Sequence, residues 1–257
     1  MKEYGLIETI KLIFFKYFKK HFNFFFKRFN KIKYIDRKNN FKKIIVDTTY
    51  FNSHFCEISK NYKSDKSPYN SKHRHSYTGI YHFLFHNIRN QNLNIAEIGC
   101  YKNEGMKMFR EYFSNSNLYG YDISEQHIES AKKDNLRNTF YYLMDVNINE
   151  NIQNGLSKCL EKFDIIIDDS SHIFDHQINI IKNSIPFLKE NAYLIVEDIF
   201  NNRKDYREEK YYESLRVFEK FFSEIYFVQS KHLNNFSPFY NNDKLLVLVR
   251  NDLSYEN

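Results

Sequence analysis

From residue 94 onward, short runs that are almost continuously apolar alternate with segments in which apolar residues recur every three or four positions. The first pattern is typical of strands that are buried on both faces, and the second of helices that cover such strands. We therefore predict a series of strands at 94–99, 117–123, 139–146, 163–168, 192–198, 226–230 and 245–250, with helices at 104–113, 125–135, 152–162, 174–188 and 211–224.

Five strand–helix units followed by two strands predict an α/β fold with a doubly wound, mostly parallel, seven-stranded Rossmann-like sheet. This core is expected over residues 94–257. Before it, the polar stretch 52–74 predicts a loop and 77–89 predicts a short helix. In a sheet of this kind the ligand binds beyond the carboxyl ends of the strands. The residues that follow each strand are therefore the candidates for chemistry.

The first 50 residues form a basic, Phe-rich arm, and the apolar period near 3.6 over 6–29 predicts a helix there. Residues 1–43 carry 13 Lys/Arg against 3 Asp/Glu, whereas the rest of the chain carries 25 Lys/Arg against 29 Asp/Glu. The positive charge therefore belongs to the arm and not to the core. The arm could pack on the core or on a second subunit, lie on a membrane surface, or contact nucleic acid.

The composition also bears on the compartment. Cys56, Cys100 and Cys159 lie far apart, which argues against a disulfide framework or a zinc site. No apolar run reaches the roughly 18 residues that a membrane span requires, and no cleavable signal peptide is recognisable. We therefore expect a cytoplasmic protein, with peripheral contact at the inner membrane face through residues 1–43 as a further hypothesis, and a homo-oligomer as an open question.

Small or acidic residues follow the first three predicted strands. Gly99 permits a tight turn and close approach of a ligand, and Glu97 can accept hydrogen bonds from a cationic amino group. Asp122 lies 23 residues after Gly99, where a carboxylate can bind a ribose diol, and Asp145 could accept from an adenine amino group. An ordinary turn, a helix N-cap and a surface acid are the respective alternatives. The candidate cofactor contacts are Glu97, Gly99, Cys100, Asp122, Ile123, Asp145 and Asp168.

The most specific pattern follows the fourth and fifth strands, which end in Asp168-Asp169-Ser170-Ser171-His172 and Glu197-Asp198. Neighbouring strand ends bring four carboxylates and one imidazole together, and such a cluster needs a cation to offset its charge. Oxygen ligands suit Mg²⁺, Mn²⁺ or Ca²⁺. His172 could take a proton from a substrate hydroxyl. Unrelated helix caps and surface acids are the alternative.

These motifs resemble those of the metal-dependent sugar O-methyltransferases, a group of class I S-adenosylmethionine-dependent enzymes that includes macrolide-sugar and rhamnosyl O-methyltransferases. The resemblance spans about residues 64–250. Ser170 stands where glycine is commoner, and 102–104 lacks the usual glycines of the first loop. The motifs that carry the resemblance are Glu97-Ile98-Gly99, Tyr119-Gly120-Tyr121-Asp122, Ile165 to His172 and Val196-Glu197-Asp198, preceded by Ser64-Asp65-Lys66 and His75-Ser76-Tyr77-Thr78.

The resemblance implies S-adenosylmethionine as the methyl donor and a divalent metal, Mg²⁺ or Mn²⁺, as a second cofactor. It implies that Asp169, Glu197 and Asp198 bind the metal and that His172 is the base, with Asp169 as the other catalytic candidate. It also implies that residues 51–93 cover the active site. The candidate acceptor contacts are His75, Tyr77 and Tyr81, with Gln177 on the helix after the fourth strand.

We therefore expect O-methylation of a sugar hydroxyl, with a nucleotide-linked sugar for capsule or another surface polysaccharide as one form of acceptor. One alternative is a nucleic-acid methyltransferase that uses the basic arm, and another is a non-catalytic membrane-associated module. Enzymes that N-methylate nucleic acid usually carry an [DNS]-P-P-[YF] tetrad where this chain has 168–171, so no nucleic-acid partner is expected. A nicotinamide-dependent oxidoreductase is disfavoured because the glycine fingerprint is incomplete.

Overall fold

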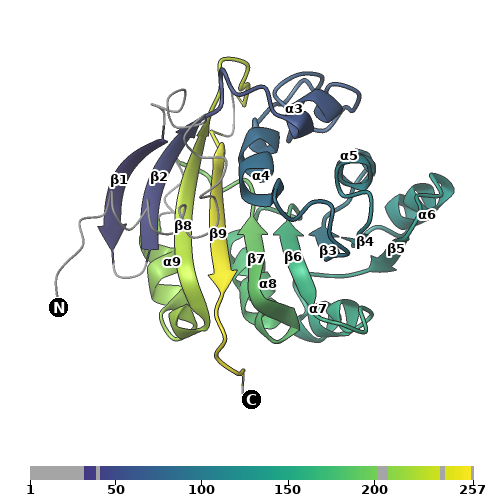
Figure 1. The fold of residues 1–257 in the computed structure, drawn as a ribbon. Helices are drawn as coiled ribbons and strands as arrows, with labels where there is room; N and C mark the ends of the chain where they lie inside the picture. Colours follow the sequence, from purple (N-terminus) through teal and green to yellow (C-terminus); the bar gives the residue numbers. More distant parts are fainter. Residues whose placement is uncertain (1–31, 39–40, 202–207, 238–240, 256–257) are drawn as a thin grey trace. The chain divides into compact units, whose positions relative to one another are not determined.

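The computed structural model describes residues 32–38, 41–201, 208–237 and 241–255 (Figure 1). The chain divides into two units, Met1–Ile32 and Lys33–Asn257, and the second contains nearly all of the described residues. The helix predicted at 6–29 lies outside the described residues. Among the helices that are described, none combines the length and the apolar character that crossing a membrane would require.

The described strands form one nine-stranded sheet in the order β1-β2-β8-β9-β7-β6-β3-β4-β5. Strands β7, β6, β3, β4 and β5 lie side by side in this order and are parallel to one another. Strand β9 lies between β7 and β8 and runs antiparallel to both. The doubly wound, mostly parallel sheet predicted from the sequence is confirmed. The strands are β1 Ile32–Lys38, β2 Phe41–Asp47, β3 Asn94–Ile98, β4 Asn117–Asp122, β5 Thr139–Leu143, β6 Phe163–Asp168, β7 Leu188–Val196, β8 Phe222–Lys231 and β9 Lys244–Arg250.

Two strands of this sheet, β1 and β2, were not predicted, so the sheet has nine strands rather than the predicted seven. They lie within residues 1–50, which were expected to be a helical arm. Strand β2 pairs in parallel with β8, and its Phe41 ring packs against Phe227 and Tyr212. The neighbouring Lys42 and Lys43, which contributed to the basic charge of the predicted arm, form ion pairs with Glu224 and Glu208.

Seven α-helices flank the sheet in the described part of the chain. Figure 1 shows α4 on one face of the sheet and α8 and α9 on the other. Helix α3 lies inside the predicted loop 52–74 and begins after Ser53, whose hydroxyl accepts a hydrogen bond from the Cys56 amide at 3.0 Å. The helices are α3 His54–Ser59, α4 Tyr77–Phe85, α5 Glu104–Tyr112, α6 Glu125–Lys133, α7 Asn149–Leu156, α8 Phe174–Ser184 and α9 Glu208–Leu215.

Alternate residues of the central strands face the two helical layers, as the geometry of a strand requires. Ile166 and Leu194 belong to a buried cluster that includes Ile181 of α8. The residue before Leu194 on β7, Tyr193, lies with its ring 5.4 Å from that of Phe85 on α4. Burial on both faces explains why the sequence of these strands is almost continuously apolar.

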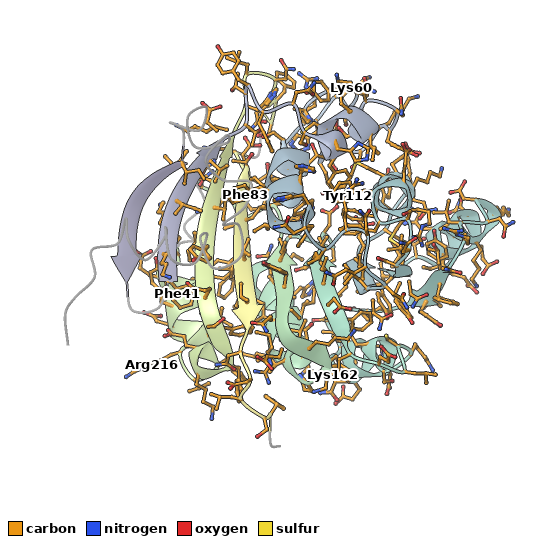
Figure 2. All side chains as sticks on the ribbon, in the orientation of Figure 1. Phe41, Lys60, Phe83, Tyr112, Lys162 and Arg216 are labelled. Carbon is orange, nitrogen blue, oxygen red and sulfur yellow. The ribbon has the colours of Figure 1, made fainter. Side chains whose placement is uncertain are left out.

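Aromatic side chains join α3, α4 and α5 into one layer. The rings of Phe55 and Tyr112 stack with their centroids 4.1 Å apart, and the Tyr112 hydroxyl lies 2.9 Å from Nδ1 of His82. Tyr112 is labelled between α4 and α5 in Figure 2. This layer holds α4, and the segment that leads into α4 reaches the candidate site.

His82 should make the stability of this layer depend on pH. Burial, and then the neighbouring His86, lower the pKa of His82 to about 4 from an ordinary value of 6.5. As the pH falls below 6.5, His82 therefore gains a proton in the unfolded chain before it does so in the folded chain. The contribution of neutral His82 to the free energy of unfolding is complete above pH 6.5 and is lost as the pH falls toward 4. We expect this group to contribute about 2 kcal/mol to that loss. Urea unfolding from pH 7 to pH 4 should show a shallower loss for His82→Gln than for the wild type. Equal slopes for the two proteins would contradict the prediction.

Candidate active site

A cavity of about 780 Å³ opens at the carboxyl ends of β3 to β6. Its size falls within the range of small-molecule sites. One part of its wall comes from the segment before α4, and the rest comes from loops that follow the strands. The lining residues that bear on the chemistry are Lys63, Asp65, Lys66, Glu97, Gly99, Cys100, Tyr101, Asp122, Ile123, Asp145, Asp169 and His172.

The loop after β3 is held against the end of β6 by Gly99. Its φ of +96° lies in the region that favours glycine, and a Cβ at this position would overlap the backbone carbonyl of Asp169. The amides of Gly99 and Cys100 both donate to the carbonyl of Tyr121, at 2.7 and 3.0 Å. The glycine therefore joins the ends of three adjacent strands at the cavity.

Replacing Gly99 with alanine should open this junction. The methyl group cannot be accommodated unless the β3 and β6 loops separate, and φ is also unfavourable for alanine, so we expect a loss of about 1–3 kcal/mol of stability. Binding of S-adenosylhomocysteine should weaken in the same variant. Thermal unfolding and calorimetric titration measure the two effects, and a variant with unchanged melting temperature and affinity would refute this account of the loop.

Glu97 lies at the floor of the cavity and is buried. Its carboxylate lies against Gly105, where any side chain would collide with it, and its Oε1 is 3.3 Å from the Nζ of Lys66. Burial raises the pKa of Glu97, and Lys66 opposes that rise. Its second oxygen, Oε2, is buried without a hydrogen-bond partner in the described structure. This oxygen can therefore accept from a cationic ligand.

Asp122 organises the adjoining turn of the cavity wall. It accepts from the amides of Tyr101 at 2.8 Å and Ser124 at 2.9 Å, and it lies 3.1 Å from Nδ1 of His127. The N-cap of α6 is Ser124 and not Asp122, so the helix-cap alternative does not account for this acid.

Asp145 and two apolar side chains complete this end of the cavity. The carboxylate of Asp145 accepts from the amide of Asn147 at 2.9 Å, and the residue lines the cavity. Tyr101 and Ile123 are 57% and 68% exposed although both are large and apolar. Exposed apolar surface beside convergent acids suits a ligand that has both an aromatic base and polar hydroxyl groups.

The opposite corner brings together the ends of β6 and β7. The Nε2 atom of His172 lies 3.7 Å from Oδ2 of Asp198 and 4.0 Å from Oδ1 of Asp169. These three side chains each offer one ligand atom within 4.8 Å of the others. Two carboxylates and an imidazole at this spacing fit a divalent cation.

Lys66 is a functional residue that the sequence indicated only as part of a motif. Its ammonium is buried and forms ion pairs with Asp169, with Glu197 at 3.1 Å and with Glu97 at 3.3 Å. Burial alone would lower the pKa of Lys66, but the three carboxylates hold it well above its ordinary value. A fixed positive charge therefore lies between the floor of the cavity and the carboxylates at the ends of β6 and β7.

Glu197, one of the three expected metal ligands, is turned toward this lysine. Its other oxygen accepts a hydrogen bond from the Tyr81 hydroxyl. Burial raises its pKa well above the ordinary value, although Lys66 acts in the opposite direction. Burial likewise raises the pKa of Asp169 to about 7 against the influence of Lys66. Lys66 alone therefore does not keep Glu197 and Asp169 fully ionised near neutral pH.

Asp198 has a different environment. Its Oδ1 accepts from the Tyr77 hydroxyl at 2.7 Å and lies 3.4 Å from Nε2 of His75. Burial would raise the pKa of Asp198, but His75, His172 and the Tyr77 hydrogen bond together hold it below the ordinary value. Asp198 is therefore the acid of this corner that stays ionised.

Two of the predicted contacts support the strand ends rather than face a ligand. Asp168, expected at the cofactor, is buried and accepts from the Ser170 amide and hydroxyl, at 3.1 and 2.6 Å. Gln177, expected at the acceptor, donates to the Glu197 carbonyl at 3.1 Å. Neither residue lines the cavity.

The other three expected acceptor contacts also lie behind the cavity wall. Tyr77, Tyr81 and His75 do not line the cavity, and they contact the acids Asp198 and Glu197 instead. Their role in this structure is therefore to hold the carboxylates at the end of β7.

Backbone strain is concentrated around the cavity. Five non-glycine residues with positive φ lie in the loops that border it or support its acids, and a conformation of this kind can cost about 1–3 kcal/mol. Tight turns hold His172 and Asp198 in place at the ends of their strands. The residues and their φ angles are Ser76 (62°), Tyr101 (42°), Asn103 (66°), His172 (55°) and Asp198 (59°).

The chain is similar to a known protein family and to individual proteins of known activity. Residues 89–235, more than half of the chain, match the family described as "Methyltransferase domain". A segment of 133 residues is 26% identical to 8-demethyl-8-(2-methoxy-alpha-L-rhamnosyl)-tetracenomycin-C 3'-O-methyltransferase of Streptomyces olivaceus, covering 49% of this chain and 33% of that protein. Mycinamicin VI 2''-O-methyltransferase of Micromonospora griseorubida is 26% identical over 136 residues, 49% of this chain and 32% of its own. The matches thus span about a third of these relatives.

Solved structures show the same fold. The structure of MycE methyltransferase in complex with Mg, SAH and mycinamycin VI superposes with a TM-score of 0.58 and 20% sequence identity, covering 78% of this chain and 55% of that chain. The crystal form with Mg and SAH gives the same TM-score with 19% identity, covering 77% of this chain and 55% of that one. At this level of identity the superposition establishes the Rossmann-like methyltransferase fold.

Proposed function

Because this chain belongs to the methyltransferase domain family, we propose that it transfers a methyl group from S-adenosylmethionine to a hydroxyl of a sugar, with the assistance of a divalent cation. The observation that carries the proposal is the convergence of Asp169 and His172, which line a cavity with Glu97 at its floor, with Asp198, which does not itself line the cavity. The similar rhamnosyl and mycinamicin O-methyltransferases support a sugar as acceptor. A nucleotide-linked sugar of a surface-polysaccharide pathway is the form of acceptor that we propose to test first.

The end of the cavity formed by β3, β4 and β5 would hold the donor. We propose that Glu97 accepts from the amino group of its methionine part, because Oε2 is buried and unpaired in the described structure. Asp122 would bind the ribose hydroxyls and Asp145 the adenine amino group, with the adenine between the exposed side chains of Tyr101 and Ile123. Gly99 and Cys100 contribute the close backbone approach.

The corner at β6 and β7 would activate the acceptor. A bound divalent cation lowers the pKa of an acceptor hydroxyl and offsets carboxylate charge. Asp169 and Asp198 are placed to hold it, and Glu197 joins them only when its contacts with Lys66 and Tyr81 loosen. His172 faces the same corner and would remove the hydroxyl proton as the oxygen attacks the sulfonium methyl group. The turns that fix these groups would supply alignment of acceptor and donor.

The proposal is tested by incubating the full chain with S-adenosylmethionine, Mg²⁺ and a panel of sugars and nucleotide-linked sugars. Mass spectrometry should detect an acceptor whose mass increases by one methylene unit, together with S-adenosylhomocysteine. Single-stranded RNA and DNA serve as negative acceptors. Methylation of nucleic acid with none of the sugars modified would overturn the proposal.

Removal of divalent cations should abolish this activity. The carboxylates at the β6 and β7 ends are buried and close together, so without a cation the acceptor hydroxyl and the carboxylates have no counter-charge beyond Lys66 and the nearby histidines. We expect chelation to lower the rate by at least about 100-fold and added Mg²⁺ or Mn²⁺ to restore it. If the chelated protein retains its full rate, the proposed role of the cation is wrong. That result would not bear on the proposed binding site for S-adenosylmethionine.

Two further predictions concern the N-terminal arm and the oligomeric state. Contact of residues 1–43 with a membrane surface is still a prediction, as is homo-oligomerisation. Flotation with anionic liposomes, comparing the full chain with a form that begins at residue 32, tests the first, and sedimentation of the full chain tests the second.

A further inference from the structure

A second group of potential ligands lies in the segment between α3 and α4. Asp65, His73 and His75 each offer one ligand atom, and these atoms all lie within 4.8 Å of one another. The ring centroids of the two histidines are 4.4 Å apart. Two imidazoles and one carboxylate form a nitrogen-rich set, unlike the mainly carboxylate set at the β6 and β7 ends.

The backbone fixes this group before any ligand binds. The His75 amide donates to the Asp65 carbonyl at 2.8 Å, which ties together the two parts of the segment that carry the ligands. Arg74, between the two histidines, exchanges hydrogen bonds with Phe236 in both directions, at 3.1 and 2.9 Å. The set is therefore held by main-chain pairing, as a preorganised site requires.

His75 has the arrangement of a metal-binding histidine. It is 1% exposed, and its Nδ1 lies 2.8 Å from Oδ1 of Asp243. Ligating histidines usually have their second nitrogen fixed by a carboxylate in this way. Asp243 is itself held by the Ser237 hydroxyl at 2.9 Å. The other nitrogen of His75, Nε2, is buried and makes no hydrogen bond with the described residues, although Asp198 lies 3.4 Å away.

We propose that Asp65, His73 and His75 form a second cation site, which takes a transition metal ion of the Zn²⁺ class and is distinct from the Asp169–His172–Asp198 corner. Two imidazoles and a carboxylate suit Zn²⁺, Co²⁺ or Fe²⁺ better than Mg²⁺. Asp198 lies between the two sites, since its Oδ1 faces His75 and its Oδ2 faces His172. An ion in the second site would hold the segment between α3 and α4 against the cavity and orient Asp198 from the side opposite to His172.

The test uses Co²⁺ as a spectroscopic probe, with the full chain and without donor or acceptor. The Asp169→Asn background weakens the other corner, so that binding there does not obscure the result. In this background we expect Co²⁺ to bind with visible absorption typical of nitrogen ligands, and Zn²⁺ to displace it. Adding His73→Ala, which changes a partly exposed side chain, should weaken binding by at least about tenfold, and Asp243→Asn should weaken it by about 10–100-fold. His54→Ala, at the exposed start of α3, is the control and should bind as the parent does.

Calorimetric titration of Zn²⁺ gives an independent readout. Zn²⁺ should bind the Asp169→Asn protein with one-to-one stoichiometry and should bind less tightly after His73→Ala. If the Asp169→Asn protein binds no Co²⁺, or if His73→Ala and the parent bind it equally, the second site does not exist. Neither result bears on methyl transfer, which is measured separately, so failure of this inference and failure of the proposed function are distinguishable.

Discussion

Replacing His172 with alanine is expected to lower kcat by about 10²–10⁴-fold, the range that loss of a positioned general base produces. The imidazole lies at the corner formed by Asp169 and Asp198, whereas the proposed donor contacts Glu97 and Asp122 lie at other parts of the cavity. The affinity for S-adenosylhomocysteine should therefore change little. Initial rates and calorimetric titration of the same protein measure the two quantities.

The matched control for this prediction is His54→Ala, which removes an exposed histidine at the start of α3. We expect it to leave kcat and donor affinity at wild-type values. A His172→Ala protein that keeps more than a tenth of the wild-type kcat would rule out a role as base. Equal losses in kcat and in donor affinity would instead indicate that the β6 loop had collapsed.

Replacing Lys66 with methionine is expected to destabilise the protein by about 3–5 kcal/mol, because it leaves buried carboxylates without their counter-charge. Lys66 pairs with Glu97, Asp169 and Glu197, and its side chain is 2% exposed. Urea unfolding at pH 7 measures the loss. The control is Lys60→Met, six positions earlier, whose pair with Glu57 at 2.8 Å is largely exposed. Water and salt screen an exposed pair, so the Lys60→Met protein should unfold at nearly the same urea concentration as the wild type.

A second substitution separates charge from packing. If the loss comes from uncompensated carboxylates, Glu197→Gln should recover part of it in the Lys66→Met protein, and lowering the pH should narrow the gap from the wild type. The pKa of Asp169 is about 7 although Lys66 lowers it, so without Lys66 its pKa should rise further and its protonation should relieve the same repulsion as the pH falls. A loss of less than about 1 kcal/mol, or a double variant no more stable than Lys66→Met, would show that Lys66 is not the counter-ion described above.

The sequence predicted those features of the fold that depend on neighbouring residues and on adjacent strands. The bounds of β6 were predicted correctly because its apolar residues are buried in a sheet that is covered on both faces, which leaves a run that is apolar except for Asp164. The acids that follow β6 and β7 were predicted to meet because adjacent parallel strands end at one edge. In the structure, Asp169 and Asp198 each have a carboxylate oxygen within 4.0 Å of Nε2 of His172.

Interactions across long stretches of chain could not be predicted in this way. Lys66 pairs with Asp169, 103 positions later, and nothing in either local sequence indicates that a surface-type residue is buried there. Tyr77 and Tyr81 were expected at the acceptor, yet each hydroxyl donates to an acid more than 100 positions away. Strand β2 was not predicted because Lys42 and Lys43 make its sequence resemble the rest of the basic arm. Its partner, β8, also lies about 180 residues later in the chain.

The position of β2 has a practical consequence for any shortened form of the protein. With β2 present, β8 is an interior strand, and its backbone groups are bonded on both sides. A truncated chain that begins at residue 51, at the boundary suggested by charge and composition, would leave the long apolar β8 as an open edge and uncover Phe227. Open apolar edges invite strand-to-strand aggregation between molecules. A shortened protein that lacks the basic N-terminal residues but stays in solution should therefore begin at Ile32 and keep β1 and β2.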